Sequence, residues 1–289
     1  METPLVTATT RIEANQDQAP PYRIRSRHRR RRRWLVYGLI AVIVMLALAA
    51  GVSIVLDPRF AQRPPSTTET PSAPRASSEG PALPRHPIAE VAASQPPLDG
   101  SDSSLVGLLQ ALWADGAGLM ALLEPRDIVR NVVATVDNLP RRASATQRSP
   151  VKLPAGAFSV ARNSESIVAS SGNALRYEPH VKLLDAVDTA RLTQLYVRHY
   201  PLFQQAYRDL GYPNGHFNDR LVEAIDVILD TPETHGELKL AQPKVFYEFA
   251  DRELEQLPTG QKLMLRMGPE NARTVKAKLT ELRKLVTAH

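Results

Sequence analysis

The chain has 289 residues, a formal net charge of +6 and no cysteine. Nine Arg and three acidic residues lie in residues 1–33, and the rest of the chain has 27 basic and 27 acidic residues. The excess charge therefore belongs to a tail, which argues against a basic nucleic-acid-binding domain. The absence of cysteine excludes disulfides, thiolate metal sites and a cysteine nucleophile.

An uncharged stretch of 23 residues, 34–56, follows this basic tail. A helix of that length reaches roughly 34 Å and can cross a hydrocarbon core of about 30 Å. Thirteen of the 23 residues are Leu, Ile or Val, and Trp34 and Tyr37 stand where an aromatic belt would lie. The sequence therefore predicts a single-pass transmembrane helix at 34–56, preceded by a disordered tail at 1–33.

The arginines in front of the apolar stretch predict its orientation. Because Lys and Arg remain on the cytoplasmic side, we expect a signal-anchor whose C-terminal part lies outside the cytoplasm. In a bacterium this is an inner-membrane anchor with its C-terminal part in the periplasm. Two alternatives are cleavage after the "ALA" at 47–49 and a twin-arginine signal in "RRRWL". The long N-terminal region and the apolar residues beyond position 49 favour an uncleaved anchor.

Residues 57–97 contain ten prolines, four basic and four acidic residues. Such a composition buries too little apolar surface to order itself and favours extended segments. The sequence therefore predicts a disordered linker that separates the membrane from a folded domain at 98–289. A second interpretation is that the linker is a ligand for a proline-recognising partner.

The domain at 98–289 is predicted to be mainly helical with a minor β element. Helices are expected where apolar residues recur at helical spacing between capping residues and prolines. The expected helices are 98–113, 124–139, 180–200, a continuation from Pro201 to Gly211, 217–232 and 269–288. Short strands are expected in 156–162, 174–178 and 244–250.

Details of these helices give further expectations. Ser101 or Asp102 can cap the first helix, Pro201 is expected to break the longest one, and Asn218 is expected to cap the helix that follows. Three apolar stripes are expected to face the core. They are Leu105, Leu108, Leu109 and Leu112; Ile128, Val132 and Val136; and Val275, Leu279, Leu282 and Val286.

Five separated blocks resemble a family of proteobacterial membrane-anchored proteins, the domain of unknown function 3014. The blocks are "LDGSD" (98–102), "VDNLPR" (136–141), "LYVRHYPLFQQAYRDLGYP" (195–213), "YEFADRELEQL" (247–257) and "QKLMLRMGPENA" (261–272). The resemblance covers about the whole of 98–289. It implies the same anchored architecture and transfers no catalytic residues.

The clearest enzymatic lead is "SPVK" (149–152) with "SGN" (171–173), which are similar to two motifs of penicillin-binding enzymes. Pro154 and Gly156 prevent the helix that this chemistry needs, and a KTG motif is missing. The histidines have no metal-ligand spacing, and no nucleotide-binding loop occurs. Asp226 and Asp230, one helical turn apart, are best interpreted as solvated. We therefore assign no catalytic, cofactor-binding or metal-binding residue.

Two residue sets suggest surfaces. An aromatic stripe at Tyr196, Tyr200, Phe203 and Tyr207 suits either a core edge or a contact surface. Seven basic residues against two acidic ones at 262–284 predict a basic face for an acidic partner, anionic lipid or wall polymer. The residues predicted to bind a partner are Arg266, Arg273, Lys276 and Lys284.

Together these patterns predict an anchored periplasmic binding or scaffolding module with an envelope protein as its partner. The first alternative is a cell-envelope enzyme with an unrecognised site. The second is a membrane signal whose arginine-rich tail is the cytoplasmic output. The sequence sets no oligomeric state.

Overall fold

The structure of the protein is a computed structural model that describes residues 83–89, 96–113, 115–142, 149–243 and 246–288. The predicted tail and transmembrane helix, and most of the predicted linker, lie outside these residues. Among the helices that are described, none is long and apolar enough to cross a membrane.

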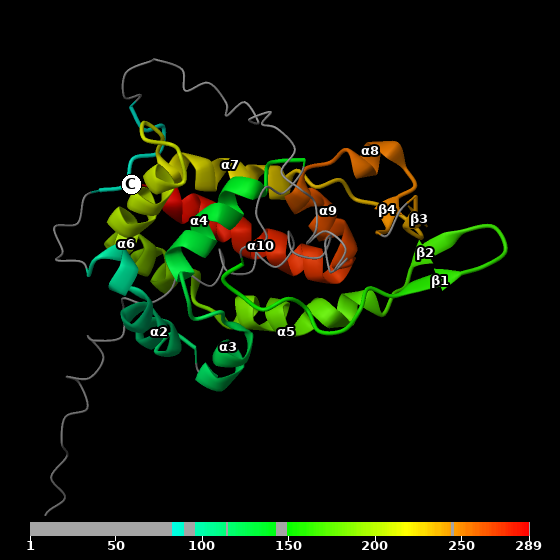
Figure 1. The fold of residues 1–289 in the computed structure, drawn as a ribbon, viewed down its shortest axis with the longest axis horizontal. Helices are drawn as coiled ribbons and strands as arrows, with labels where there is room; N and C mark the ends of the chain where they lie inside the picture. Colours follow the sequence, from blue (N-terminus) through cyan, green and yellow to red (C-terminus); the bar gives the residue numbers. More distant parts are fainter. Residues whose placement is uncertain (1–82, 90–95, 114, 143–148, 244–245, 289) are drawn as a thin grey trace, which may run out of the picture. The chain divides into compact units, whose positions relative to one another are not determined.

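Helices dominate the described chain, and four short strands form one sheet (Figure 1). After a 3₁₀ turn at Leu98–Gly100, the helices are α2 (Asp102–Gln110), α3 (Gly116–Leu122), α4 (Ile128–Asn138), α5 (Asn173–Ala186), α6 (Thr189–Asp209), α7 (Phe217–Leu229), α8 (Arg252–Glu255), α9 (Thr259–Arg266) and α10 (Pro269–Val286). The strands are β1 (Val160–Arg162), β2 (Ile167–Ala169), β3 (Lys239–Ala241) and β4 (Glu248–Phe249). The predicted class, mainly α with a minor β element, is confirmed for this part of the chain.

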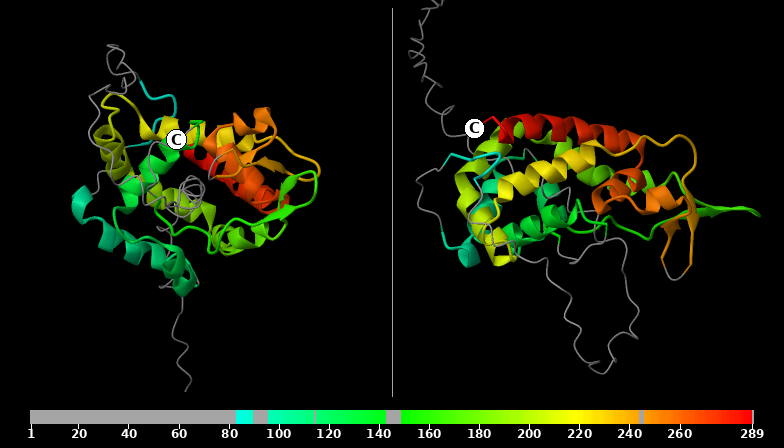
Figure 2. Two further views of the ribbon diagram at one scale, coloured as in Figure 1. Left: turned by 45° about the vertical axis from the view of Figure 1, so that its right-hand side comes forward. Right: turned by 90° about the horizontal axis from the view of Figure 1, so that it is seen from above.

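A bundle of α4, α5, α6, α7 and α10 forms the centre of the described unit. Helix α10 packs against α5, α6 and α7, and α4 packs against α6 and α7; Figure 2 shows α10 and α7 running side by side. Two predicted apolar stripes are confirmed in full as buried. They are Ile128, Val132 and Val136 in α4, and Val275, Leu279, Leu282 and Val286 in α10.

The predicted break at Pro201 is wrong, because α6 continues through this proline. An interior proline removes one N–H and crowds the preceding turn, at a cost of about 3 kcal/mol. Leu202 and Phe203, directly after it, are only 3% and 0% exposed, and burial of such a side chain contributes about 1.5–3 kcal/mol. Their packing offsets the cost of the proline. The chain breaks instead at Asp188, whose carboxylate accepts a hydrogen bond from the first turn of α6.

Of the polar residues expected to cap helices, Ser101 lies at the N-cap position of α2 without a side-chain cap bond, and Asn218 and Asp102 have other roles. Asn218 is not the cap of α7, because the helix begins one residue earlier and Asn218 is fully buried. Ser101 precedes α2, and its hydroxyl donates to the Leu98 carbonyl oxygen at 2.8 Å. The Asp102 carboxylate accepts hydrogen bonds from the N–H groups of Asp127 (2.7 Å) and Ile128 (3.0 Å), and so ties α2 to the start of α4.

The sheet has the order β1-β2-β3-β4, and each neighbouring pair is antiparallel. Strand β1 lies within the predicted range 156–162, and β4 within 244–250. The strand predicted at 174–178 is wrong, because these residues are in α5 with Tyr177 packed into the main core. Leu240, Phe249 and Leu265 form a second, smaller apolar cluster between the sheet and α9.

Candidate functional site

The four residues predicted to bind a partner do not share one exposed face. Arg266 belongs to α9, and its guanidinium lies over the Phe249 ring, 5.3 Å from the centroid. Burial lowers the pKa of Arg266. The sequence interpretation treated 262–284 as one surface, but Gly268, with φ of 86°, separates α9 from α10. Arg266 therefore joins α9 to the sheet.

Two lysines of α10 bind the carboxyl ends of neighbouring helices. The Lys276 ammonium donates to the Thr231 carbonyl oxygen (2.7 Å), just beyond α7. The Lys278 ammonium donates to the Val187 carbonyl oxygen (3.0 Å), just beyond α5. Carbonyl groups at helix ends lack intrahelical partners and carry partial negative charge. Part of the basic character of α10 therefore serves the bundle itself.

Arg273 and Lys284 are the predicted partner-binding residues that remain exposed on α10. Arg273 forms an ion pair with Glu270 at 2.5 Å, between side chains that are 70% and 81% exposed. Lys284 has no side-chain partner within the part of the chain that the structure describes. The role of both residues in partner binding stays a prediction.

A hollow of about 370 Å³ lies against the outer face of α10. Its lining consists of Asp185, Arg273, Thr274, Ala277, Lys278 and Glu281. Two of these are basic and two are acidic. The Glu281 carboxylate accepts a hydrogen bond from the Thr189 hydroxyl (2.6 Å), so this wall of the hollow also holds α10 to the start of α6.

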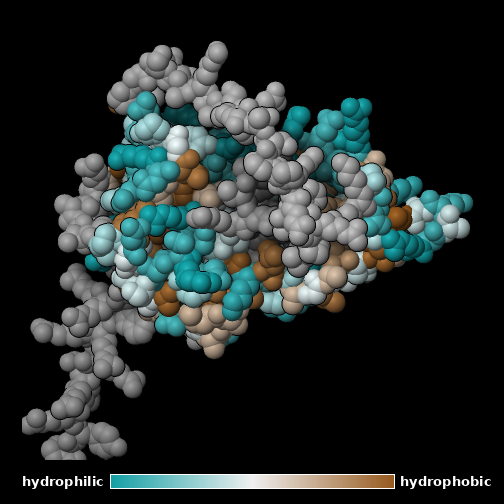
Figure 3. All heavy atoms as spheres, in the orientation of Figure 1, coloured by the Kyte–Doolittle hydropathy of each residue, from teal (hydrophilic) through white to brown (hydrophobic). Residues whose placement is uncertain are grey.

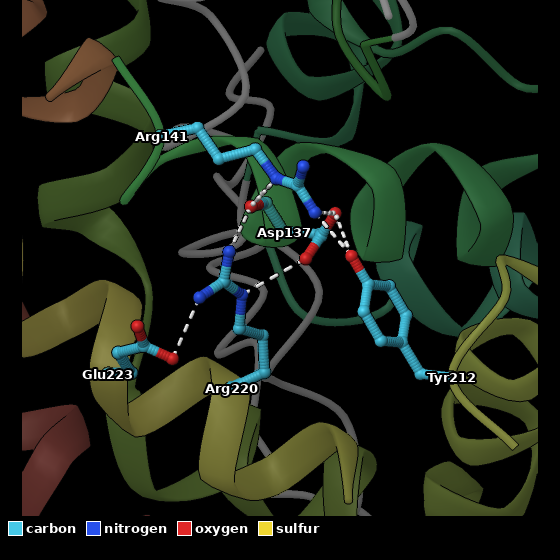
Figure 4. Close-up of polar contacts among 5 residues, drawn as sticks. All are labelled: Asp137, Arg141, Tyr212, Arg220 and Glu223. Carbon is cyan, nitrogen blue, oxygen red and sulfur yellow. Dashed lines mark hydrogen bonds and ion pairs between the residues drawn. The ribbon is translucent and has the colours of Figure 1, made fainter. Parts of the chain in front are cut away.

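The densest charged cluster surrounds Asp137, near the end of α4 (Figure 4). Its carboxylate is 8% exposed and accepts Arg220 Nε at Oδ1 (3.1 Å) and Arg141 Nη2 at Oδ2 (2.8 Å). The Tyr212 hydroxyl donates to Oδ2 (3.2 Å) and accepts a second contact from Arg141. Arg220 also pairs with Glu223 at 2.7 Å. The cluster thus joins α4, α7 and the loop after α6.

The same two arginines satisfy the end of α4. Arg220 Nη2 and Arg141 Nε donate to the Asp137 carbonyl oxygen, at 2.6 Å and 3.1 Å. This carbonyl lies in the last turn of the helix, where cations are favourable. Burial works against the charged guanidinium, but the bonds to Glu223 and Asp137 raise the pKa of Arg220.

The bonding of the cluster limits its chemistry. Both Asp137 carboxylate oxygens already accept bonds from cationic or phenolic donors, so the carboxylate is fully engaged within the cluster. Burial and the nearby Asp137 raise the pKa of Tyr212, so the phenol stays protonated and can donate. The arrangement locks helices together.

The aromatic stripe belongs mainly to the core. Tyr196 and Phe203 are fully buried, and their rings meet edge to face with centroids 5.4 Å apart. Tyr207 stacks on Tyr212 at 4.5 Å and so continues the stripe to the charged cluster. On the face of the molecule drawn in Figure 3, hydrophobic and hydrophilic residues are intermixed wherever no grey atoms cover it.

The other residues singled out in the sequence make structural bonds within the fold. The Ser149 hydroxyl donates to the Val151 carbonyl oxygen (2.7 Å), and the Lys152 ammonium donates to the Ala121 carbonyl oxygen (3.0 Å). Asp226 pairs with Arg283, with Nη2 and Oδ2 3.1 Å apart. No group of three or more His, Asp or Glu among the described residues could hold a metal ion.

Sequence reasoning missed the Asp137 cluster because its members are distant in the chain. Asp137, Arg141 and Tyr212 do fall within two of the blocks, 136–141 and 195–213, that carry the family resemblance. Residues 128–283 match the family described as "Protein of unknown function (DUF3014)". No curated protein and no solved structure matches the chain. The matched region is more than half of the 289 residues, and the chain belongs to this family.

Proposed function

We propose that the chain is an inner-membrane-anchored periplasmic binding or scaffolding module of the bacterial cell envelope. The observation that carries the proposal is the uncharged stretch 34–56 directly behind a cluster of arginines. Its transfer into hydrocarbon is favourable, whereas the arginines are retained in the cytoplasm. The linker then carries the folded unit away from the membrane surface.

The charge arrangement of the folded unit supports binding over catalysis. The Asp137 cluster and the α10 lysines hold helices together, which favours a rigid body that presents a fixed surface. Arg273, which lines the hollow along α10, and Lys284 remain exposed on that surface. The partner that fits them is an acidic envelope protein.

The anchored topology is tested with two fusions of the full chain. A reporter that is active only in the periplasm, fused after residue 288, should be active, and the same reporter placed before residue 1 should be silent. The intact chain should stay with membranes during alkaline extraction. Activity of a cytoplasmic reporter at the C-terminal end would refute the topology.

The binding role is tested by photo-cross-linking in cells. A photoreactive residue in place of Lys284 should capture one specific envelope protein, and Lys284→Glu should weaken its recovery. Leu153, 42% exposed and distant in sequence, provides the control position. Equal capture from both positions would contradict a specific surface on α10.

A further inference from the structure

A short segment before the domain is bound to the amino end of α7. The N–H groups of Arg85 and His86 donate to Asp219 Oδ2 (3.0 Å) and Oδ1 (2.8 Å). Asn218 Nδ2 donates to the His86 carbonyl oxygen (2.9 Å). Ile88 packs against the main core. More than 130 residues of sequence separate the two sides of this contact.

The segment reads "PRHP", residues 84–87, and its prolines determine which donors it offers. Proline has no N–H, so Arg85 and His86 carry the only two N–H groups of these four residues. In a straight strand successive N–H groups point to opposite sides, but the chain bends at these two residues. Both groups then face one carboxylate, as successive N–H groups do in anion-binding concavities of the main chain.

The receptor side is positioned by the bundle and not by the segment. Asn218 is fully buried, and its Oδ1 accepts the Tyr196 hydroxyl at 3.0 Å. Its Nδ2 also donates to the Val286 carbonyl oxygen, at the end of α10, at 3.0 Å. These two bonds to α6 and α10 fix the amide before the segment arrives, which reduces the entropic cost of binding.

We propose that Asn218 and Asp219 form a receptor for the main chain of a Pro-x-x-Pro segment, and that residues 84–87 of this chain occupy it as a strap. All three bonds reach main-chain groups, and the Arg85 side chain points into solvent. The receptor therefore depends on the proline spacing and on an apolar residue after it, here Ile88. The proline-recognising partner of this part of the linker is the domain itself.

The strap changes where the chain leaves the folded unit. The sequence places the end of the linker at residue 97, whereas the strap already contacts the folded unit at residues 85–88. The inference requires only the folded unit and holds whether or not residues 34–56 cross a membrane. For an anchored protein, the docked strap shortens the linker and the released strap lengthens it.

Hydrogen exchange of the Arg85 and His86 amides in the purified full chain tests the strap. Both amides should be protected, and Asp219→Asn should accelerate their exchange by roughly tenfold to a hundredfold, because it weakens two bonds to a charged acceptor. The matched control is Asp230→Asn, at the exposed end of the same helix. It removes the same charge and should leave both amides protected.

Two variants of the strap itself keep the test independent of the folding of α7. Arg85→Pro removes one donated N–H and should accelerate exchange of the His86 amide, whereas Arg85→Ala should leave it unchanged. Exchange within α7 should stay slow in both. Unprotected amides in the wild-type chain, or equal effects of the proline and alanine variants, would overturn the proposal.

Discussion

The helical bundle and the four-stranded sheet differ in how completely they exclude water. In the bundle, side chains such as Phe217, Leu221 and Leu279 have 0% exposure. In the cluster beneath the sheet, Leu240, Phe249 and Leu265 are 4–8% exposed, and the neighbouring apolar residues are only partly buried. Since stabilisation follows the apolar area removed from water, we expect the bundle to set global stability and the sheet to open first.

Phe217→Ala should lower the free energy of unfolding more than any other substitution proposed here, because the Phe217 ring lies in the centre of the bundle. It contacts the rings of Tyr196, Phe203 and Tyr207, with centroids 5.7–6.3 Å apart. Truncation of a fully buried phenylalanine lowers the free energy of unfolding by about 3–5 kcal/mol. Urea denaturation followed by helical circular dichroism measures the loss. If Phe217→Ala lowered the free energy of unfolding less than Phe249→Ala does, the bundle would not be the region that sets global stability.

Asp137→Ala should cause the second-largest fall in the free energy of unfolding, because it removes the carboxylate that joins α4, α7 and the loop after α6. Breaking a buried ion pair costs about 3–5 kcal/mol. Since the Arg141 side chain is 35% exposed and can return to water, we expect about 2–4 kcal/mol. Urea denaturation measures the loss, and Asp230→Ala on exposed α7 surface is the control. Equal losses in the two variants would show that the cluster contributes nothing.

Phe249→Ala tests the sheet directly. The substitution opens the smaller apolar cluster and removes the ring beneath Arg266. We expect a loss of about 1–3 kcal/mol, below that in the bundle because the surroundings can relax. Hydrogen exchange should accelerate in β3, β4 and α8 and stay slow in α6 and α7. Acceleration throughout the bundle would mean that the two regions open together.

The same contrast explains what the sequence could predict of the fold. The bundle helices follow apolar residues at helical spacing over two or more turns, so α7 and α10 were predicted close to their true limits. The predicted start of α4 was too early, because the helix begins at Ile128 and not at residue 124. The strands are two or three residues long, too short for alternation to stand out, and β2 and β3 were missed. The sequence of 174–178 resembles a strand, but in the fold these residues belong to helix α5, which buries Tyr177 in the core. Tertiary packing, which no local pattern contains, decided these cases.

The sites were less predictable than the fold because their residues meet only in three dimensions. Asp137 and Arg220 are 83 positions apart, and His86 and Asn218 are 132 positions apart. The prediction of a basic face grouped Arg266 with the lysines of α10, but the turn at Gly268 sends Arg266 towards the sheet. Neither the proline spacing at 84–87 nor its receptor on α7 was singled out from the sequence, because no repeated proline spacing stands out in the linker.

Lys276→Met should lower the free energy of unfolding only slightly, because the lost contact lies at the edge of the bundle. The substitution keeps most of the aliphatic stem and removes the ammonium that binds the carbonyl beyond α7. A cation at a helix carboxyl end contributes about 0.3–1 kcal/mol. The fall in the free energy of unfolding should be of this size in low salt and should shrink in high salt. Lys239→Met is the control, because Lys239 is exposed in β3 and lies at no helix end, and it should change stability less.

The smallest effect concerns pH and the junction between the two regions. His180 lies in α5, and its Nε2 contacts the Lys152 carbonyl oxygen at 3.2 Å, in the segment that leads to β1. Burial lowers the pKa of His180 below its ordinary value of 6.5. Below about pH 6.5 the unfolded chain binds a proton at this histidine more readily than the folded chain does. The free energy of unfolding therefore falls as the pH drops below about 6.5.

Gln does not titrate, so His180→Gln removes this difference in proton binding. The fall in the free energy of unfolding between pH 7.5 and 5.5 should therefore be smaller in His180→Gln than in the wild-type chain. Burial also lowers the pKa of His199, which lies inside α6, so His199→Gln should flatten the same profile. The two variants separate the regions in exchange experiments at pH 5.5. His180→Gln should slow the opening near β1, whereas His199→Gln should slow only global opening. Identical patterns would mean that the junction is as tightly coupled to the bundle as α6 itself.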